Sequence, residues 1–270
     1  MDRRGLLALL AGSVVAGLTA CSSEGTKAAP KGSTSAKNGS GETKKTSTDG
    51  RKKMFGPPKG IVKAPLPRGT LYALPGKGDN IALTVDDGID EAVVAGYARL
   101  ARDTGMRLTF FCNGINPSWT MHKDLLRPLI DSGQCIIANH TWSHPSLVGL
   151  SSAGVVDQVQ RNETFLRNTY GVTGRPFLRP PFGYFNDVLD NQLADLGYPA
   201  VTMWLGSLSD ATVISPARIM FHARQWFLPQ HLVIGHANHP AVMHDYGKLV
   251  DLIKERHLQP VHLGDVFQLT

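Results

Sequence analysis

Short apolar runs alternate along most of the chain with longer stretches in which apolar residues recur at helical spacing. The runs predict strands and the stretches predict amphipathic helices, so the pattern indicates an α/β fold with parallel strands. A small (β/α) barrel fits this pattern, and a doubly wound open sheet is the alternative. The predicted strands are residues 81–86, 107–112, 134–139, 176–179, 200–204, 231–236 and 259–263. The predicted helices are residues 93–101, 123–132, 151–170, 187–196, 215–227 and 241–256.

Residues 1–20 have the pattern of a secretory signal peptide, with two arginines, an apolar stretch and then small residues. The ending "LTAC" is typical of a bacterial lipobox, in which the cysteine, here Cys21, is lipidated and becomes the mature N-terminus. An ordinary signal peptide with a chance cysteine is the alternative. The segment "DRRGLLA" also leaves both Sec and twin-arginine export open. We therefore expect an exported protein that is lipid-anchored at the outer face of the cell membrane.

Residues 21–60 are predicted to form a flexible linker after the lipidated cysteine. They are rich in Ser, Thr, Gly, Lys and Pro, so they cannot bury enough apolar surface to offset the entropy of ordering. They also carry most of the net charge of +6, which leaves residues 61–270 near neutral. The charge is therefore no evidence for a nucleic-acid partner, and the basic linker suits anionic lipid headgroups or wall polymers. Residues 61–270 are long enough for one domain, which we expect to be a monomer.

The two remaining cysteines are predicted to be buried thiols. Cys112 ends one predicted strand and Cys135 begins the next. If these strands are parallel neighbours, the two residues lie at opposite ends of the strands, too far apart to form a disulfide.

Polar residues collect where the predicted strands end, and in α/β folds this is where sites form. A chance placement of solvated loop residues would not repeat in this way at five strands. The residues are Asp86 and Asp87, Asn139, His140 and His144, Arg179, Ser207 and Asp210, and His236.

The segment "NHTWSHP" places His140 and His144 at a spacing that lets two imidazoles face one point. With a carboxylate they offer two nitrogens and one oxygen to a cation, leaving positions open for water or substrate. Alone this pair is weak evidence, because surface histidines are common. The neighbouring "DDG" at the end of the first predicted strand supplies the carboxylate.

Five segments resemble the motifs of the polysaccharide deacetylases, the NodB-homology group of carbohydrate esterase family four. "TVDDG" (84–88), "HTWSHP" (140–145) and "RPPFG" (179–183) are similar to the first three motifs, in order. "LTFFCNG" (108–114) and "VIGH" (233–236) are similar to the second strand and the last motif. The resemblance implies a distorted (β/α)7-8 barrel that forms a single catalytic domain. It also implies a divalent metal, usually zinc, and hydrolysis of N-acetyl, sometimes O-acetyl, groups on cell-wall or related glycans.

The same resemblance implies roles for individual residues. Asp87, His140 and His144 match the metal ligands. Asp86 matches the general base that takes a proton from the attacking water, and a metal makes that water more acidic. Arg179 matches the cation that pairs with Asp86 and favours its carboxylate form.

Two further roles follow from the resemblance. The backbone N–H of Phe182 matches the group that stabilises the oxyanion of the tetrahedral intermediate. His236 matches the general acid that protonates the leaving amine. Phe182, Trp142 and Trp204 are candidates for the walls of a sugar site, although aromatic residues in such places are more often part of the core.

The chain departs from the family pattern at the fourth motif, which has two acids and a tryptophan. Ser207, Asp210 and Ala211 stand at these three places, and Ala237 replaces an acid that often follows the last histidine. Because a nearby carboxylate would raise the pKa of His236, these changes affect the predicted acid. Either proton donation is slower, or Asp210 supplies the carboxylate by a different path. Ester substrates depend less on this proton than amides do.

Three functions are consistent with these observations. The first is a membrane-anchored, metal-dependent deacetylase acting on polysaccharide or peptidoglycan. The second is a catalytically weakened or inactive glycan-binding protein on the same scaffold, which the altered fourth motif favours. The third is a metal hydrolase of the same fold that acts on non-peptide C–N bonds of small molecules.

Overall fold

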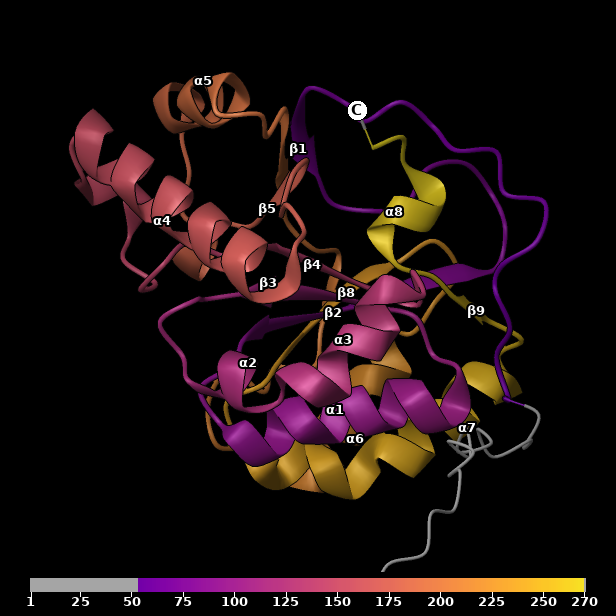
Figure 1. Ribbon diagram of the computed structural model, residues 1–270. Helices are drawn as coiled ribbons and strands as arrows, with labels where there is room; N and C mark the ends of the chain where they lie inside the picture. The colour runs from indigo at the N-terminus through magenta and orange to yellow at the C-terminus, as the bar shows by residue number, and fades with distance from the viewer. Residues whose placement is uncertain (1–52, 270) are drawn as a thin grey trace, which may run out of the picture. The chain divides into compact units, whose positions relative to one another are not determined.

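The computed structural model describes residues 53–269, and the strands among them form one sheet (Figure 1). The predicted signal peptide, Cys21 and most of the predicted linker lie outside the described residues. All pairings between the named strands are parallel, as the strand–helix alternation predicts. The strands are β1 (Gly69–Leu71), β2 (Asn80–Asp87), β3 (Leu108–Cys112), β4 (Cys135–Asn139), β5 (Phe177–Leu178), β6 (Ala200–Thr202), β7 (Gly206–Ser207), β8 (Leu232–His236) and β9 (Gln259–Pro260).

The predicted helices are all present, and the last of them begins with a short 3₁₀ segment, η3 (Pro240–Asp245). β1, β7 and the two shortest helices were not predicted from the pattern, because each is too short to show a period. None of the helices in residues 53–269 is both long and apolar enough to cross a membrane. The α-helices are α1 (Glu91–Thr104), α2 (Ser118–Met121), α3 (Lys123–Asp131), α4 (Ser152–Tyr170), α5 (Asp187–Asp195), α6 (Pro216–Trp226), α7 (Tyr246–Glu255) and α8 (Leu263–Val266).

The sheet is curled into a half-barrel. Its strands follow the order β1-β6-β5-β4-β3-β2-β8-β7, and β9 pairs with the beginning of β2. Among the described residues, the two end strands β1 and β7 do not pair with each other, so the barrel stays open on one side. The prediction of a distorted (β/α) barrel is therefore confirmed, with the distortion located at this gap.

The strands alternate between a face covered by helices and a face that lines the inside of the half-barrel. In β2, Leu83 and Val85 pack into the cluster formed with α1, α3, α6 and α7, which cover one side of the sheet in Figure 1. Ala82 belongs to a separate interior cluster that includes residues of α8. By the same alternation, Thr84 and Asp86 face the interior. The first predicted site residue is therefore placed by the ordinary pleat of its strand.

The register of β3 and β4 confirms the prediction for the two cysteines. Cys112 pairs with Asn139, while Cys135 pairs with Leu108 at the other end of the strands. Both thiols are free and buried, and burial raises the pKa of Cys135 to about 12. They therefore remain protonated core residues.

Packing begins before residue 61, where the predicted linker ends. Phe55 is buried in the helix-covered cluster, and its backbone N–H donates to the carbonyl of Thr104. Gly105 lies so close that a Cβ there would meet the Phe55 carbonyl oxygen at 2.0 Å. The end of the predicted linker is thus tied to the C-terminal end of α1.

Candidate active site

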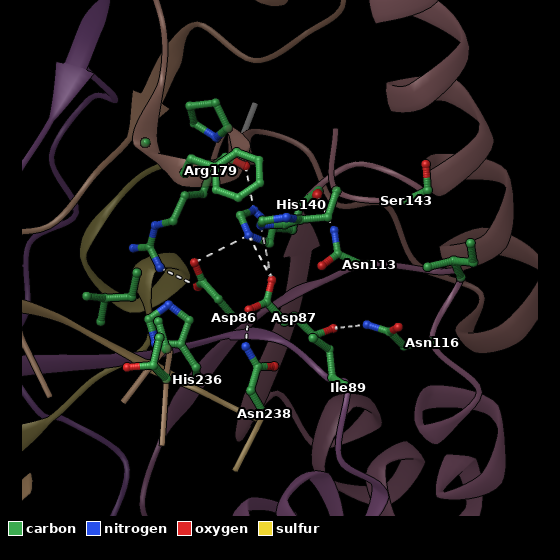
Figure 2. Close-up of a pocket in the computed structure, with 18 of the residues that line it drawn as sticks. Asp86, Asp87, Ile89, Asn113, Asn116, His140, Ser143, Arg179, His236 and Asn238 are labelled. Carbon is green, nitrogen blue, oxygen red and sulfur yellow. Dashed lines mark hydrogen bonds and ion pairs between the residues drawn. The ribbon is translucent and has the colours of Figure 1, made fainter. Parts of the chain in front are cut away.

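The predicted site residues meet in one pocket of about 550 Å³, which opens where the parallel strands end (Figure 2). Asparagines and apolar side chains form much of the rest of its lining, among them Asn113, Asn116, Ile89 and Trp204. The structure thus brings into one pocket residues that come from the ends of separate strands. The predicted residues that line the pocket are Asp86, Asp87, His140, His144, Arg179, Phe182 and His236.

Asp86 is held by a buried arginine. Arg179 Nη1 donates to Asp86 Oδ1 at 2.5 Å and also to Thr84 Oγ1 at 2.9 Å. Thr84 and Asp86 are two residues apart on β2, so their side chains leave the same face of the strand and reach one guanidinium. The Asp86 carboxylate is therefore paired with a full positive charge.

Arg179 is in turn fixed by contacts that do not involve the pocket's carboxylates. Its Nε donates to the carbonyl of Thr202 at 3.0 Å and its Nη2 to the carbonyl of Met203 at 2.9 Å. The guanidinium carbon lies 4.2 Å from the centre of the Phe111 ring, a cation–π contact. Arg179 is fully buried, so it acts as a rigid support that sets the position of Asp86.

Asp87 would point toward the helices if β2 kept its alternation. Instead its φ is 72°, in the left-handed region, which breaks the alternation at this residue. The turn is held by Trp119 Nε1 and Asn116 Nδ2, which donate to the Asp87 carbonyl at 2.9 Å and 3.0 Å. Two adjacent carboxylates can therefore both face the pocket, because one follows the pleat and the other follows the turn.

His140 presents one ring nitrogen to the carboxylates. Its Nδ1 lies 2.6 Å from the carbonyl oxygen of Arg179, so Nδ1–H is the donor and Nε2 is left with a free lone pair. Nε2 lies 3.3 Å from Asp87 Oδ1 and 3.6 Å from Asp86 Oδ2. This arrangement is the usual one for a metal-binding histidine, whose second nitrogen donates to a carbonyl.

His144 completes a three-residue cluster with Asp87 and His140 whose ligand atoms all lie within 4.8 Å of one another. His144 Nε2 is also 3.3 Å from Asp87 Oδ1. Nitrogen and oxygen ligands at ordinary bond lengths from a tetrahedral Zn²⁺ are about 3.3 Å apart. The donor types and their spacing therefore fit a divalent cation such as zinc, with room for further ligands from the pocket.

The charges of the cluster affect its titration. Burial alone would raise the pKa of Asp87, but the hydrogen bond and charge of His140 outweigh it and hold this pKa below its usual value. Burial would lower the pKa of His140, but the charge of Asp86 and the contact with Asp87 raise it. Burial and the charge of His140 lower the pKa of His144. Without a cation, a proton on His140 stabilises the carboxylates, and a metal would have to displace it.

His236 faces the same pocket from β8, whose register places it beside Asp86. Its Nδ1 lies 3.0 Å from Oδ1 of Asp210, a buried carboxylate. Burial alone would lower the pKa of His236, but the hydrogen bond to Asp210 and the charge of Asp86 outweigh it, so the pKa is raised. The sequence left open whether Asp210 reaches His236 despite the altered fourth motif, and the structure places the two in contact.

Other expectations from the sequence have mixed outcomes. Phe182 and Trp204 line the pocket, but Trp142 does not; its ring packs on Phe165 and lies under Arg161. His239, the other histidine close to His236 in the sequence, is also outside the pocket lining. Trp142 was misplaced because it follows Thr141, whose left-handed φ of 70° redirects the chain.

Two contacts were missed by sequence reasoning. Thr84 lies in "TVDDG", and its role as a partner of Arg179 follows from strand alternation two residues before Asp86. Asn238 donates to Asp87 Oδ2 at 2.6 Å, and its only sequence signal is its position two residues after His236. A spacing of two is too common in strands to identify a site by itself.

Comparison with known proteins agrees with this geometry. Residues 73–201 match the family model described as polysaccharide deacetylase. A chitin deacetylase from Pestalotiopsis is 30% identical over 143 residues, which is 53% of this chain and 47% of that protein. A peptidoglycan-N-acetylglucosamine deacetylase from Bacillus cereus is 30% identical over 113 residues, 42% of this chain and 38% of that protein. The chain thus matches about half or less of the length of these relatives.

Solved structures support the same fold. The chitin deacetylase from Colletotrichum lindemuthianum has a TM-score of 0.67 at 22% identity, covering 76% of this chain and 94% of that one. A pseudoenzyme of carbohydrate esterase family 4 from Bacillus anthracis has a TM-score of 0.66 at 17% identity, covering 75% of this chain and 70% of that one. At these identities the likeness establishes the fold alone.

The curled parallel sheet and the residues gathered at its strand ends define a domain of the carbohydrate esterase family 4 fold. Residues 73–201 of this chain are thus similar to the polysaccharide deacetylase family.

Proposed function

We propose that this chain is a metal-dependent deacetylase that hydrolyses N-acetyl groups of cell-wall or related polysaccharides, with O-acetyl esters as a second substrate class. The observation that carries the proposal is the arrangement of the pocket. A three-residue metal cluster and a paired carboxylate lie on one side, and a histidine with its own carboxylate lies on the other. The chitin and peptidoglycan deacetylases among the relatives support these substrate classes.

Asp87, His140 and His144 are the residues that would hold the cation, with zinc the best match to two imidazoles and a carboxylate. When bound, it would polarise the acetyl carbonyl and make the attacking water more acidic.

Asp86 is the proposed general base. It accepts the proton of the water as the water oxygen bonds to the acetyl carbon. Arg179 holds the carboxylate in place through its hydrogen bond to Oδ1. Because Arg179 is fixed by Thr202 and Met203, Asp86 keeps its orientation when its charge changes.

His236 is the proposed general acid. It gives its Nε2 proton to the amide nitrogen as the C–N bond breaks, and the products are acetate and a free amine. Asp210 favours the protonated imidazole through its contact with Nδ1. The backbone N–H of Phe182, a residue with a left-handed φ of 60°, is proposed to stabilise the oxyanion of the tetrahedral intermediate.

Export and anchoring remain part of the proposal. We expect Cys21 to carry lipid at the outer face of the cell membrane, with the linker between Cys21 and the folded domain spanning the distance to the glycan. Metabolic labelling with a fatty-acid analogue should mark the wild-type protein, and Cys21→Ser should remove the label. A labelled Cys21→Ser variant would contradict the anchor.

The test of the function is acetate release. Purified residues 53–270 would be loaded with zinc and incubated with chitooligosaccharides, peptidoglycan and acetylated xylan. We expect Asp86→Asn to lower the rate by a factor of about 10² to 10⁴, the usual contribution of a general base. An unchanged rate in Asp86→Asn would contradict the assignment of the base.

A glycan-binding protein on the same scaffold is the second candidate. It is favoured by the structural likeness to a family 4 pseudoenzyme and by the changes at Ser207 and Ala237. The same assay separates the two functions. Zinc binding and glycan binding without acetate release from any of the three substrates would favour the binding function.

A further inference from the structure

The two oxygens of the Asp87 carboxylate have different partners. Oδ1 lies 3.3 Å from Nε2 of both His140 and His144, where a cation would sit between them. Oδ2 accepts a hydrogen bond from Asn238 Nδ2 at 2.6 Å. Figure 2 shows Asn238 reaching Asp87 from the side away from His140. One oxygen is therefore free for a metal and the other is already occupied.

The position of Asn238 is set by the backbone on either side of it. The N–H of Ala237 donates to the Asp86 carbonyl at 3.0 Å, which extends the pairing of β8 with β2 by one residue. The carbonyl of Ala237 accepts from the N–H of Asp90 at 2.9 Å. Because both peptide groups of Ala237 are tied to the Asp86–Asp90 turn, the next side chain is placed beside the Asp87 carboxylate.

The orientation of the Asn238 amide is determined by its neighbour. Only the NH₂ group can face a carboxylate oxygen, since the reverse orientation would place two acceptors together. The other end, Oδ1, is buried and has no hydrogen-bond partner within residues 53–269. A buried acceptor without a partner costs stability. A residue retained only for packing would not carry this cost, so the contact with Asp87 is the feature that accounts for an asparagine at this place.

Asn238 is a neutral donor, so its effect on Asp87 differs from the effect of a charged side chain such as Arg179. Arg179 compensates the charge of Asp86, whereas Asn238 takes one oxygen of Asp87 and leaves the full negative charge in place. Because Oδ2 accepts a hydrogen bond from Asn238, the carboxylate would bind a cation chiefly through Oδ1. A coordination position then stays open on the cation, as a catalytic metal site requires.

We propose that Asn238 is a positioning residue of the metal centre: it holds Asp87 in one-oxygen binding and so raises the affinity of the site for its cation. This inference rests on the proposed metal-dependent function. It goes beyond that function by assigning a role to a residue outside the ligands, the base and the acid.

The test measures metal affinity, with no substrate. Apo protein would compete with a coloured chelator for Zn²⁺, comparing the wild type with Asn238→Leu, which keeps the approximate shape and removes the donor. We expect zinc binding to weaken by a factor of about 10 to 100, the usual effect of removing a partner of a metal ligand. Asn238→Ala serves as the second variant if the leucine variant does not fold.

Asn116→Leu is the matched control. Asn116 lines the same pocket, but its amide donates to the backbone carbonyl of Asp87 and does not reach the carboxylate. We expect this variant to weaken zinc binding less than Asn238→Leu does, because Trp119 Nε1 still donates to the same Asp87 carbonyl. Equal losses in both variants would show that the turn at Asp87, and not its carboxylate contact, sets the affinity, and would overturn the proposal.

Cobalt(II) gives an independent readout. Its visible absorption is strong in four-coordinate sites and weakens when a carboxylate binds through both oxygens. We expect Asn238→Leu to lose intensity as Asp87 Oδ2 becomes free to bind. Unchanged zinc affinity and an unchanged cobalt spectrum in this variant would overturn the role of Asn238 while leaving the proposed function intact. Wild-type protein that binds neither metal would overturn both.

Discussion

The two sides of the pocket hold their reactive groups in different ways. On one side, Asp86 and Asp87 are fixed by partners that the family motifs supply, a buried Arg179 and a turn at the end of β2. On the other side, His236 keeps a carboxylate partner although the family's fourth motif is incomplete, because Asp210 lies 3.0 Å from its Nδ1. The first side has all of its motif residues, whereas the second keeps only one acid of its motif, Asp210, and that acid makes the contact with His236. Changes at the other motif positions are therefore poor evidence that this contact is lost.

The largest expected effect tests the side of the pocket that holds Asp86 and Asp87. Replacing His140 with glutamine removes a ligand and should abolish zinc-induced stabilisation. Zinc at 100 times its dissociation constant should stabilise the wild type by about 2.7 kcal/mol, because it binds only the folded state. Thermal melts with and without zinc measure this, and His239→Gln, outside the pocket, is the control. A His140→Gln variant with the full zinc effect would contradict the metal cluster.

The second prediction concerns Ala237, which stands where the family often has an acid after the last histidine. It asks whether an acid can be introduced there. Ala237 is fully buried in the helix-covered cluster, so Ala237→Asp would place a carboxyl group among apolar side chains. We expect the free energy of unfolding to fall by about 1–3 kcal/mol, the usual cost of a buried polar group without a partner. Urea denaturation measures the loss, with Ala237→Ser as a smaller neutral control. A stable Ala237→Asp variant with faster acetate release would show that this side lacks an acid it could use.

The third prediction concerns the contact of His236 with Asp210, the remaining acid of the fourth motif. Asp210→Asn removes the charge that helps raise the pKa of His236. The protonated acid exists below this pKa and is lost as the pH rises through it, so the alkaline limb of the pH–rate profile should move to lower pH. We expect N-acetyl substrates to lose rate at neutral pH by a factor of about 10, because less of His236 is protonated. O-acetyl esters should lose less. Equal losses for both substrate classes would contradict the role of Asp210.

The smallest expected effect concerns the pH dependence of the free energy of unfolding, and not that of the reaction rate. His262 lies away from the pocket, and burial, together with the charge of Arg107, lowers its pKa to about 4 despite Asp265. The unfolded chain binds the proton more readily, so stability should fall as the pH drops below the unfolded value of 6.5. The loss between about pH 6 and pH 5 should be about 1 kcal/mol. In denaturation experiments, His262→Gln should flatten the slope of the free energy of unfolding against pH. The alkaline limb of the pH–rate profile should stay unchanged. An unaltered slope would contradict this assignment.

The sequence predicts the site well wherever a residue's direction follows from the pleat of a strand. Asp86 and His236 are examples, because each follows an apolar strand whose alternation assigns its face. Strand alternation alone gives no direction for a side chain where the backbone leaves the regular regions. Asp87 and Thr141 have left-handed φ values, and no alternation rule gives the direction of the next side chain. β7 was missed for a different reason, since two residues carry no period.

Gly88 and Trp119 limit the substitutions that each other's position can accept. A Cβ at residue 88 would lie 2.4 Å from Trp119 Nε1, and the φ of Gly88 is 94°, so no other residue fits while the indole is present. Replacing Trp119 first would open the space, but it would also remove the donor to the Asp87 carbonyl. Any single substitution at Gly88 or at Trp119 is therefore expected to disturb the turn at Asp87. A ring outside the pocket lining thus limits which substitutions the turn at Asp87 can accept.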